Sequence, residues 1–254
     1  MANDVLTDVD GDILIITINR PEARNALNAT AGAAIAVAVD RLDDDDSLRA
    51  GVLTGAGGTF CSGMDLKAFL AGESPDVPGR GLAGITQHRP RKPLIAAVEG
   101  YALAGGLELA LACDMIVASR SAKLGVPEVR RALVAAAGGV LVLPQRIPVN
   151  VAMEMVLTGE AITAARAYDL GLVNALADDG GALDLARDLA HRIARNGPLA
   201  VAASKLLVHT GRGWSDAERW ARQDEVIAPI FSSEDAREGA RAFAEKREPI
   251  WSGS

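Results

Sequence analysis

Two glutamates follow turns that could hold a negatively charged oxygen on the backbone. Glu108 lies three residues after Gly105, in residues 100–110, where a glycine-rich turn opens an apolar helix. The first N–H groups of a helix have no intrahelical partner and carry the positive end of its dipole. Glycine also lets a ligand approach the backbone closely. This turn therefore suits a developing oxyanion, with Glu108 on nearly the same helix face as Gly105.

A second candidate site surrounds Glu128. Pro127 precedes this glutamate and fixes the backbone, and an apolar segment containing Gly138 and Gly139 follows. A third candidate, residues 59–66, is another turn before a helix. On pattern alone, each glutamate is more typical of a structural residue at a helix start, and the turn is typical of an ordinary cap.

Other catalytic arrangements find little support in the sequence. None of His88, His191 and His209 has a metal-spaced partner or lies near a nucleophile elbow. The glycine-rich turn at 55–58 lacks the Lys-Ser/Thr of a phosphate-binding loop and the full dinucleotide fingerprint. We therefore expect neither a metal nor a nucleotide cofactor.

Composition indicates a globular protein that does not bind nucleic acid. The 254 residues are 49% hydrophobic and 23% charged, and the net charge of −7 repels phosphate backbones. Cys61 and Cys113 lack metal or redox spacing, so we expect buried thiols in a reducing compartment. There is no apolar stretch of about 18 residues and no recognisable signal peptide. These features predict a cytoplasmic location.

The elements that must position the glutamates alternate between strand and helix, which predicts an α/β fold. Apolar, β-branched runs predict strands at 13–18, 50–53, 94–98 and 115–118. A helical pattern at 28–42 lies between the first two strands. Residues 72–92 show no clear period and predict a mobile loop or a short irregular helix. After about residue 161 strand signals nearly stop, and helical patterns follow, at 163–170, 181–195, 198–210, 215–225 and 233–246.

Taken together, these segments resemble the crotonase (enoyl-CoA hydratase/isomerase) superfamily. The resemblance begins at Asn-Arg-Pro-Glu-Ala-Arg-Asn-Ala-Leu-Asn, residues 19–28, and continues through the three candidate sites. It includes Met-Glu-Met-Val-Leu-Thr-Gly at 153–159 and residues 167–173, and it closes at 238–247. The order and spacing of these motifs, along nearly the whole chain, identify the family.

The resemblance implies a spiral of ββα units followed by helices that pack against neighbouring subunits. Residues 1–195 would then form the crotonase-like α/β core with the acyl-CoA site, and residues 196–254 the helical oligomerisation region of a homotrimer or a dimer of trimers. Coenzyme A would enter as part of the thioester substrate, with no separate cofactor.

The family's functional residues carry over to matching positions. The N–H groups of Met64 and Gly105 would form an oxyanion hole. The backbone around Ala26 and the run Met64, Asp65, Leu66 and Lys67 would line the coenzyme A path. Phe243 and Lys246 match tail positions that reach the adenine end, often across a subunit boundary.

Both glutamates are present, as in hydratases of fatty-acid β-oxidation, whereas isomerases often keep one. The resemblance therefore predicts an enoyl-CoA hydratase that adds water across the 2,3 double bond of a trans-2-enoyl-CoA, with Glu108 as base and Glu128 as acid. The alternatives are an enoyl-CoA isomerase or specialised acyl-CoA dehydratase of this superfamily, and a non-catalytic acyl-CoA-binding protein. Leu124 stands where an aromatic is common, and alanines replace the usual Pro-Gly-Ala before Gly138. These two changes leave the acyl chain open.

Overall fold

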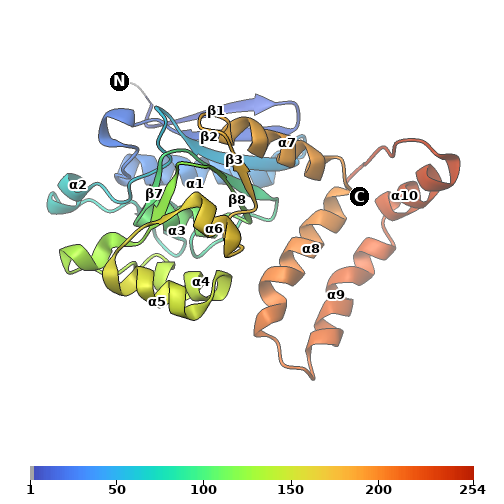
Figure 1. Ribbon diagram of the computed structural model, residues 1–254. Helices are drawn as coiled ribbons and strands as arrows, with labels where there is room; N and C mark the ends of the chain where they lie inside the picture. The colour runs from blue at the N-terminus through green and yellow to red at the C-terminus, as the bar shows by residue number, and fades with distance from the viewer. Residues whose placement is uncertain (1–2) are drawn as a thin grey trace.

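A computed structural model, which describes residues 3–254, has a twisted six-stranded sheet at its centre (Figure 1). The first two strands pair antiparallel, and the remaining neighbours run parallel. Four of the strands are predominantly apolar, as expected for a sheet covered on both faces. In spatial order the strands are β1 (Val5–Asp10), β2 (Ile13–Ile18), β3 (Ala50–Gly55), β6 (Leu94–Val98), β8 (Met115–Ser119) and β11 (Ala175–Ala177).

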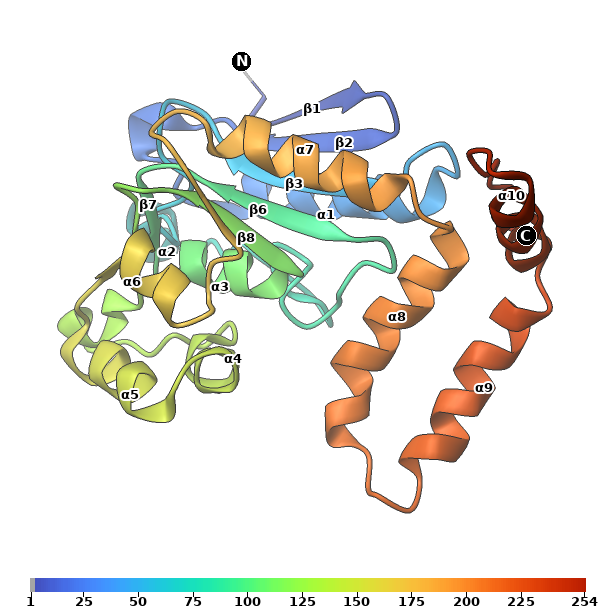
Figure 2. The same ribbon diagram turned by 45° about the vertical axis from the view of Figure 1, so that its right-hand side comes forward.

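Helices cover the two faces of this sheet, so alternate residues of one strand enter different cores. Leu14 and Ile16 of β2 pack in the larger core, with α1 (Ala29–Asp44) and α3 (Gly105–Ala112). Ile13 and Ile15 face α7 (Ala182–Ala194), which lies across the opposite face (Figure 2). The expected α/β class is confirmed.

A smaller three-stranded sheet brings the two glutamate-bearing segments together. It contains β7 (Tyr101–Leu103), β9 (Lys123–Gly125) and β10 (Ile162–Thr163). β7 and β9 run parallel, with Leu103 opposite Gly125. α3, which carries Glu108, follows β7, and the 3₁₀ helix at Pro127–Arg131, which carries Glu128, follows β9. Both segments therefore begin at the same end of this sheet.

The helices and strands on either side of the site are short. The loop predicted at 72–92 is largely irregular and contains one small hairpin, β4 (Asp76–Val77) and β5 (Gly81–Leu82). The expectation that strands nearly stop after residue 161 missed β10 and β11, since strands of two and three residues show no recognisable period. The nearby helices are α2 (Leu66–Leu70), α4 (Gly139–Arg146), α5 (Val149–Thr158) and α6 (Ala164–Asp169).

The last helices leave the layers of the sheet. They are α8 (Pro198–Thr210), α9 (Arg219–Phe231) and α10 (Glu234–Glu245). They extend away from the body of the molecule (Figures 1 and 2). α7 ends at Ala194 and still packs on the sheet, so the change in architecture falls beside the predicted division at residue 195, which stays a prediction. Among the described helices, none is long and apolar enough to cross a membrane.

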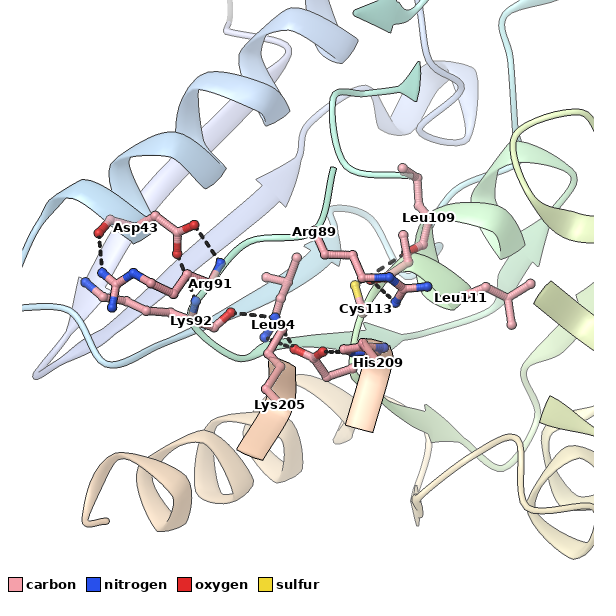
Figure 3. Close-up of polar contacts among 12 residues, drawn as sticks. Asp43, Arg89, Arg91, Lys92, Leu94, Leu109, Leu111, Cys113, Lys205 and His209 are labelled. Atoms are coloured by element: carbon pink, nitrogen blue, oxygen red, sulfur yellow. Dashed lines mark hydrogen bonds and ion pairs between the residues drawn. The ribbon is translucent and has the colours of Figure 1, made fainter. Parts of the chain in front are cut away.

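A buried ionic cluster fastens α8 to the sheet (Figure 3). Asp114, the residue before β8, accepts hydrogen bonds from Lys205 Nζ at 2.7 Å and His209 Nε2 at 2.8 Å. It also accepts the Leu94 N–H at 2.8 Å. Lys205 donates in addition to the carbonyl of Lys92 at 2.8 Å. One carboxylate therefore links α8 to two neighbouring strands.

Candidate active site

Glu108 lies on α3, a helix whose every residue is buried. The side chain is only 5% exposed, yet it is not unpaired, because its Oε1 accepts the backbone N–H of Gly139 at 2.8 Å. Gly139 is the first residue of α4, so its N–H has no partner within that helix. Glu108 is thus held by Gly139, one of the two adjacent glycines that follow Glu128 in the sequence.

Glu128 lies in the first turn of the 3₁₀ helix that begins at Pro127. Its side chain is half-buried, and Oε2 is a buried atom without a hydrogen-bond partner in the described part of the chain. A buried carboxyl oxygen without a partner is costly unless a ligand or water binds it. The geometry therefore leaves Glu128 free to exchange a proton with a bound molecule.

The two carboxyls are electrostatically similar, since burial disfavours the charge on each. Burial raises the pKa of Glu108 to about 7, the hydrogen bond from Gly139 opposes that rise, and the charge of Glu128 adds to it. Burial likewise raises the pKa of Glu128, opposed by its own backbone N–H and by Arg131. The negative charge of Glu128 makes ionisation of Glu108 less favourable, so Glu108 keeps its proton to a higher pH than an exposed glutamate does.

The backbones at Met64 and Gly105 lie side by side. A Cβ placed on Gly105 lies 3.7 Å from the Met64 nitrogen, and one placed on Gly63 lies 3.2 Å from the Gly105 nitrogen. Gly105 is the first residue of α3, so its N–H has no intrahelical partner. Within residues 3–254 neither N–H donates a hydrogen bond. Two adjacent free donors can stabilise one oxyanion.

An unusual backbone conformation sets the direction of the Gly105 N–H. Ala104 has φ 52° and ψ −129°, a region that alanine rarely occupies. Its N–H donates to Gly125 O at 2.9 Å, and its carbonyl accepts the Glu108 N–H at 3.1 Å. Strain of this kind is found at functional sites where surrounding contacts enforce it. Sequence reasoning missed Ala104, because nothing in its residue type signals a positive φ.

The residues predicted to line the coenzyme A path fall into two groups. An isolated parallel bridge between Leu27 and Met64 brings Ala26 beside the run from Met64 to Asp65. Leu66 and Lys67 follow on the exposed side of α2. These five residues therefore form one continuous stretch of surface, which Met64 joins to Gly105.

The tail residues are not part of this group within one chain. Phe243, which is 88% exposed, lies on α10, and Lys246 caps the end of that helix. α10 lies at the opposite end of the molecule from α2 in both views (Figures 1 and 2). A route across a subunit boundary stays a prediction.

No group of His, Cys, Asp and Glu side chains in the described residues could hold a metal ion. Cys61 and Cys113 are free, buried thiols, as expected.

The chain resembles known proteins over its whole length. A family model described as enoyl-CoA hydratase/isomerase matches residues 8–254. Enoyl-CoA hydratase EchA1 from Mycobacterium marinum has a crystal structure that is 58% identical, with a TM-score of 0.98 and 100% of both chains covered. Enoyl-CoA hydratase EchA19 from Mycobacterium tuberculosis is 42% identical over 97% of this chain and 95% of the relative.

Other relatives carry a more specialised name. Carnitinyl-CoA dehydratase from Salmonella arizonae is 44% identical over 100% of both chains. The crystal structure of carnitinyl-CoA hydratase from Mycobacterium avium is 44% identical, with a TM-score of 0.80 and 100% of both chains covered.

Proposed function

Because the chain belongs to the enoyl-CoA hydratase/isomerase family, we propose that it hydrates the 2,3 double bond of a trans-2-enoyl-CoA to give a 3-hydroxyacyl-CoA. The protein is an enzyme, with relatives named as hydratases and dehydratases, and its substrate class is an acyl-CoA thioester. One observation carries the finer proposal: a buried carboxyl and a half-buried one, both with raised pKa, occur together with two adjacent unused N–H groups.

In the proposed reaction, the thioester oxygen lies between the N–H groups of Met64 and Gly105. Ionised Glu108 takes a proton from water, and the water oxygen forms a bond to the β-carbon. The π electrons move toward the thioester, whose oxygen gains negative charge. Protonated Glu128 then gives its proton to the α-carbon as the carbonyl re-forms. Transfer of the Glu108 proton to Glu128 through solvent restores the starting state.

Each part of this site has a typical contribution. Removal of one oxyanion donor lowers rates about 10²–10³-fold, and a general acid or base contributes about 10²–10⁴-fold. Neither contribution needs a metal or a separate cofactor. Activity should therefore be unchanged after treatment with a chelator and dialysis.

A panel of trans-2-enoyl-CoA thioesters of increasing chain length tests the proposal. Loss of the enoyl thioester absorbance, with a product heavier by one water, supports hydration. A product of unchanged mass with a shifted double bond contradicts it and supports an isomerase. Tight binding without turnover of any chain length supports a non-catalytic acyl-CoA-binding protein.

The second candidate is a specialised dehydratase, which the relatives named carnitinyl-CoA dehydratase favour. The same two carboxyls serve the reverse reaction, because a hydratase site lowers the barrier in both directions. Carnitinyl-CoA should be compared with an unsubstituted 3-hydroxyacyl-CoA of equal chain length. A kcat/KM at least tenfold higher for carnitinyl-CoA favours this candidate, and the opposite ratio favours the simple hydratase.

We also propose that the chain assembles as a homotrimer or a dimer of trimers through its C-terminal helices. Large apolar side chains are exposed there, with Trp220 at 66%, Phe231 at 79% and Phe243 at 88%. Large exposed apolar side chains mark contact surfaces where they lie together. Light scattering on the full chain should give three or six times 26.3 kDa, and a monomeric mass contradicts the assembly. In the assembled enzyme, Phe243→Ala should raise KM with little change in kcat.

A further inference from the structure

Arg20 is a largely buried arginine outside the proposed set of catalytic groups. Its side chain is only 14% exposed. The guanidinium donates to the Ala26 carbonyl through Nη1 and to Asp65 Oδ2 through Nη2, the latter at 3.1 Å. Nε also lies 3.6 Å from Asp4 Oδ2. One side chain thus reaches two segments separated by almost forty residues in sequence.

Hydrogen bonds between these two segments fix the backbone on both sides of Met64. Leu27 donates its N–H to Gly63 O at 2.8 Å and accepts the Asp65 N–H at 2.8 Å. The bridge fixes the residues on both sides of Met64 and uses neither its N–H nor its carbonyl. Arg20 links the same two segments from outside, because it binds Ala26, next to Leu27, and Asp65, next to Met64. We call these linked segments, residues 26–27 and 63–65, the frame of Met64.

Two further contacts make this frame rigid. Asp65 Oδ1 caps α2 by accepting the N–H groups of Lys67 at 3.0 Å and Ala68 at 3.3 Å. The Arg20 backbone N–H donates to Asn25 Oδ1 at 2.9 Å, and Asn25 is fully buried with φ 55°. Burial raises the pKa of Asp65, but hydrogen bonds from Arg20 and from the α2 N–H groups outweigh it and leave the pKa below its usual value. The Asp65 carboxylate therefore stays charged opposite Arg20.

We propose that Arg20 is a positioning residue for the reaction, which binds Ala26 O and Asp65 together so that the Met64 N–H meets the thioester oxygen. This inference rests on the proposed function, since it assigns a purpose to the Met64 donor. A planar guanidinium offers several donors in a fixed fork, so it can bind both groups at once, whereas a lysine ammonium is a single point charge. A donor displaced from the oxyanion loses part of the 10²–10³-fold that such a group supplies.

Steady-state kinetics on the full-length enzyme test the proposal. Arg20→Met should lower kcat about 10–100-fold, as expected for a displaced donor, while KM changes less than about threefold. Arg20→Lys keeps the charge but only one of the two contacts, so its kcat should fall between wild type and Arg20→Met. Arg187→Met is the matched control, because Arg187 pairs with Asp10 at 2.7 Å beside the β1–β2 turn and should leave kcat unchanged. A folded Arg20→Lys or Arg20→Met with wild-type kcat overturns the proposal.

A spectroscopic readout separates positioning from a general loss of structure. trans-Cinnamoyl-CoA absorbs at longer wavelength when its thioester carbonyl accepts strong hydrogen bonds, and under the proposed function Glu108→Gln should prevent its turnover. Adding Arg20→Met to this variant should reduce the red shift by at least half, with Kd within about threefold. An unchanged red shift overturns the Arg20 proposal. A wild-type enzyme without hydration, together with no red shift in Glu108→Gln, contradicts the proposed function itself.

Discussion

The Gly139 N–H donates to Oε1 of Glu108 at 2.8 Å, and this bond fixes one oxygen of a buried carboxylate. The position also requires glycine, because a Cβ on residue 139 lies 3.1 Å from Oε1 and 2.8 Å from the Ala135 Cβ. The sequence pair Gly138-Gly139 therefore acts on the site through its backbone.

Gly139→Ala should lower both activity and stability. The added methyl group meets Oε1 of Glu108 and the Val126 Cγ1, the latter at 3.2 Å, so it displaces the carboxylate or the start of α4. We expect kcat to fall at least tenfold and the free energy of unfolding to fall about 1–3 kcal/mol, as for other overpacked sites. Gly213→Ala is the control, since nothing lies within 4 Å of its added Cβ. Equal kcat values for the two variants contradict this account of Gly139.

The pH dependence of activity should follow the titration of Glu108. As the proposed base, Glu108 must be ionised, and its pKa is raised to about 7. The value of kcat/KM should therefore fall as the pH drops through about 7, with a slope of one proton. A flat profile between pH 5 and 8 contradicts the role of Glu108 as base.

Glu128→Gln should lower kcat about 10²–10⁴-fold, because the proposed acid is lost. It should also shift the titration of Glu108. The negative charge of Glu128 contributes to the raised pKa of Glu108, so a neutral glutamine should lower that pKa. Carboxyl ¹³C NMR of glutamate-labelled protein measures the titration without catalysis. Glu160→Gln, an exposed carboxylate on the surface, is the control and should change neither quantity. An unchanged Glu108 titration in Glu128→Gln indicates that the two carboxyls are not coupled.

The central strands could be predicted because their own residues are mostly apolar and β-branched. β2, β3, β6 and β8 are buried on both faces and have predominantly apolar sequences. β1 lies at the sheet edge with four of its six residues exposed, so it has no such run and the sequence did not identify it. The strands β10 and β11 owe their conformation to pairing with β9 and β8 rather than to their own residues.

The residues of the candidate site likewise divide into those that a local sequence pattern reveals and those that it does not. Glu108, Glu128 and Gly105 could be selected because charged residues and glycines near helix starts form local patterns. The Gly139 donor to Glu108 spans 31 residues and the Arg20 contact with Asp65 spans 45 residues, so no local pattern reveals either. The positive φ of Ala104 depends on its bond to Gly125 across the small sheet. Tertiary contacts supply the geometry that residue types alone cannot.

Glu108→Gln should be more stable than wild type at alkaline pH. A folded-state pKa of about 7 lies above the unfolded value of about 4.3, so the folded state prefers the protonated carboxyl. The contribution of Glu108 to stability is then complete below about pH 4 and is lost as the pH rises through 7. Glutamine keeps an oxygen for the Gly139 N–H and never ionises. The difference in unfolding free energy should therefore grow by up to about 3 kcal/mol between pH 4 and pH 8. A constant difference across this range contradicts the raised pKa.

Lys205→Met should destabilise the protein by loosening α8 from the sheet. Asp114 is only 14% exposed, and removing one partner of a buried ion pair typically costs about 3–5 kcal/mol. The control is Arg222→Met, whose ion pair with Glu218 is half-exposed and contributes at most about 1 kcal/mol. Denaturant unfolding with equal slopes measures both.

The pH dependence of that loss identifies its origin. Burial raises the pKa of Asp114, but the His209 hydrogen bond and the Lys205 charge outweigh it and leave the pKa below its usual value. The stabilisation by Asp114 is therefore complete above about pH 4, its unfolded pKa, and is lost as the pH falls through the lower folded value. The deficit of Lys205→Met relative to wild type should therefore shrink as the pH falls, because protonation of Asp114 removes the charge that the variant leaves unpaired. The added substitution Asp114→Asn should recover part of the loss at neutral pH, because it removes the uncompensated buried charge. A double variant no more stable than Lys205→Met shows that lost packing of the lysine stem, and not the charge on Asp114, is responsible.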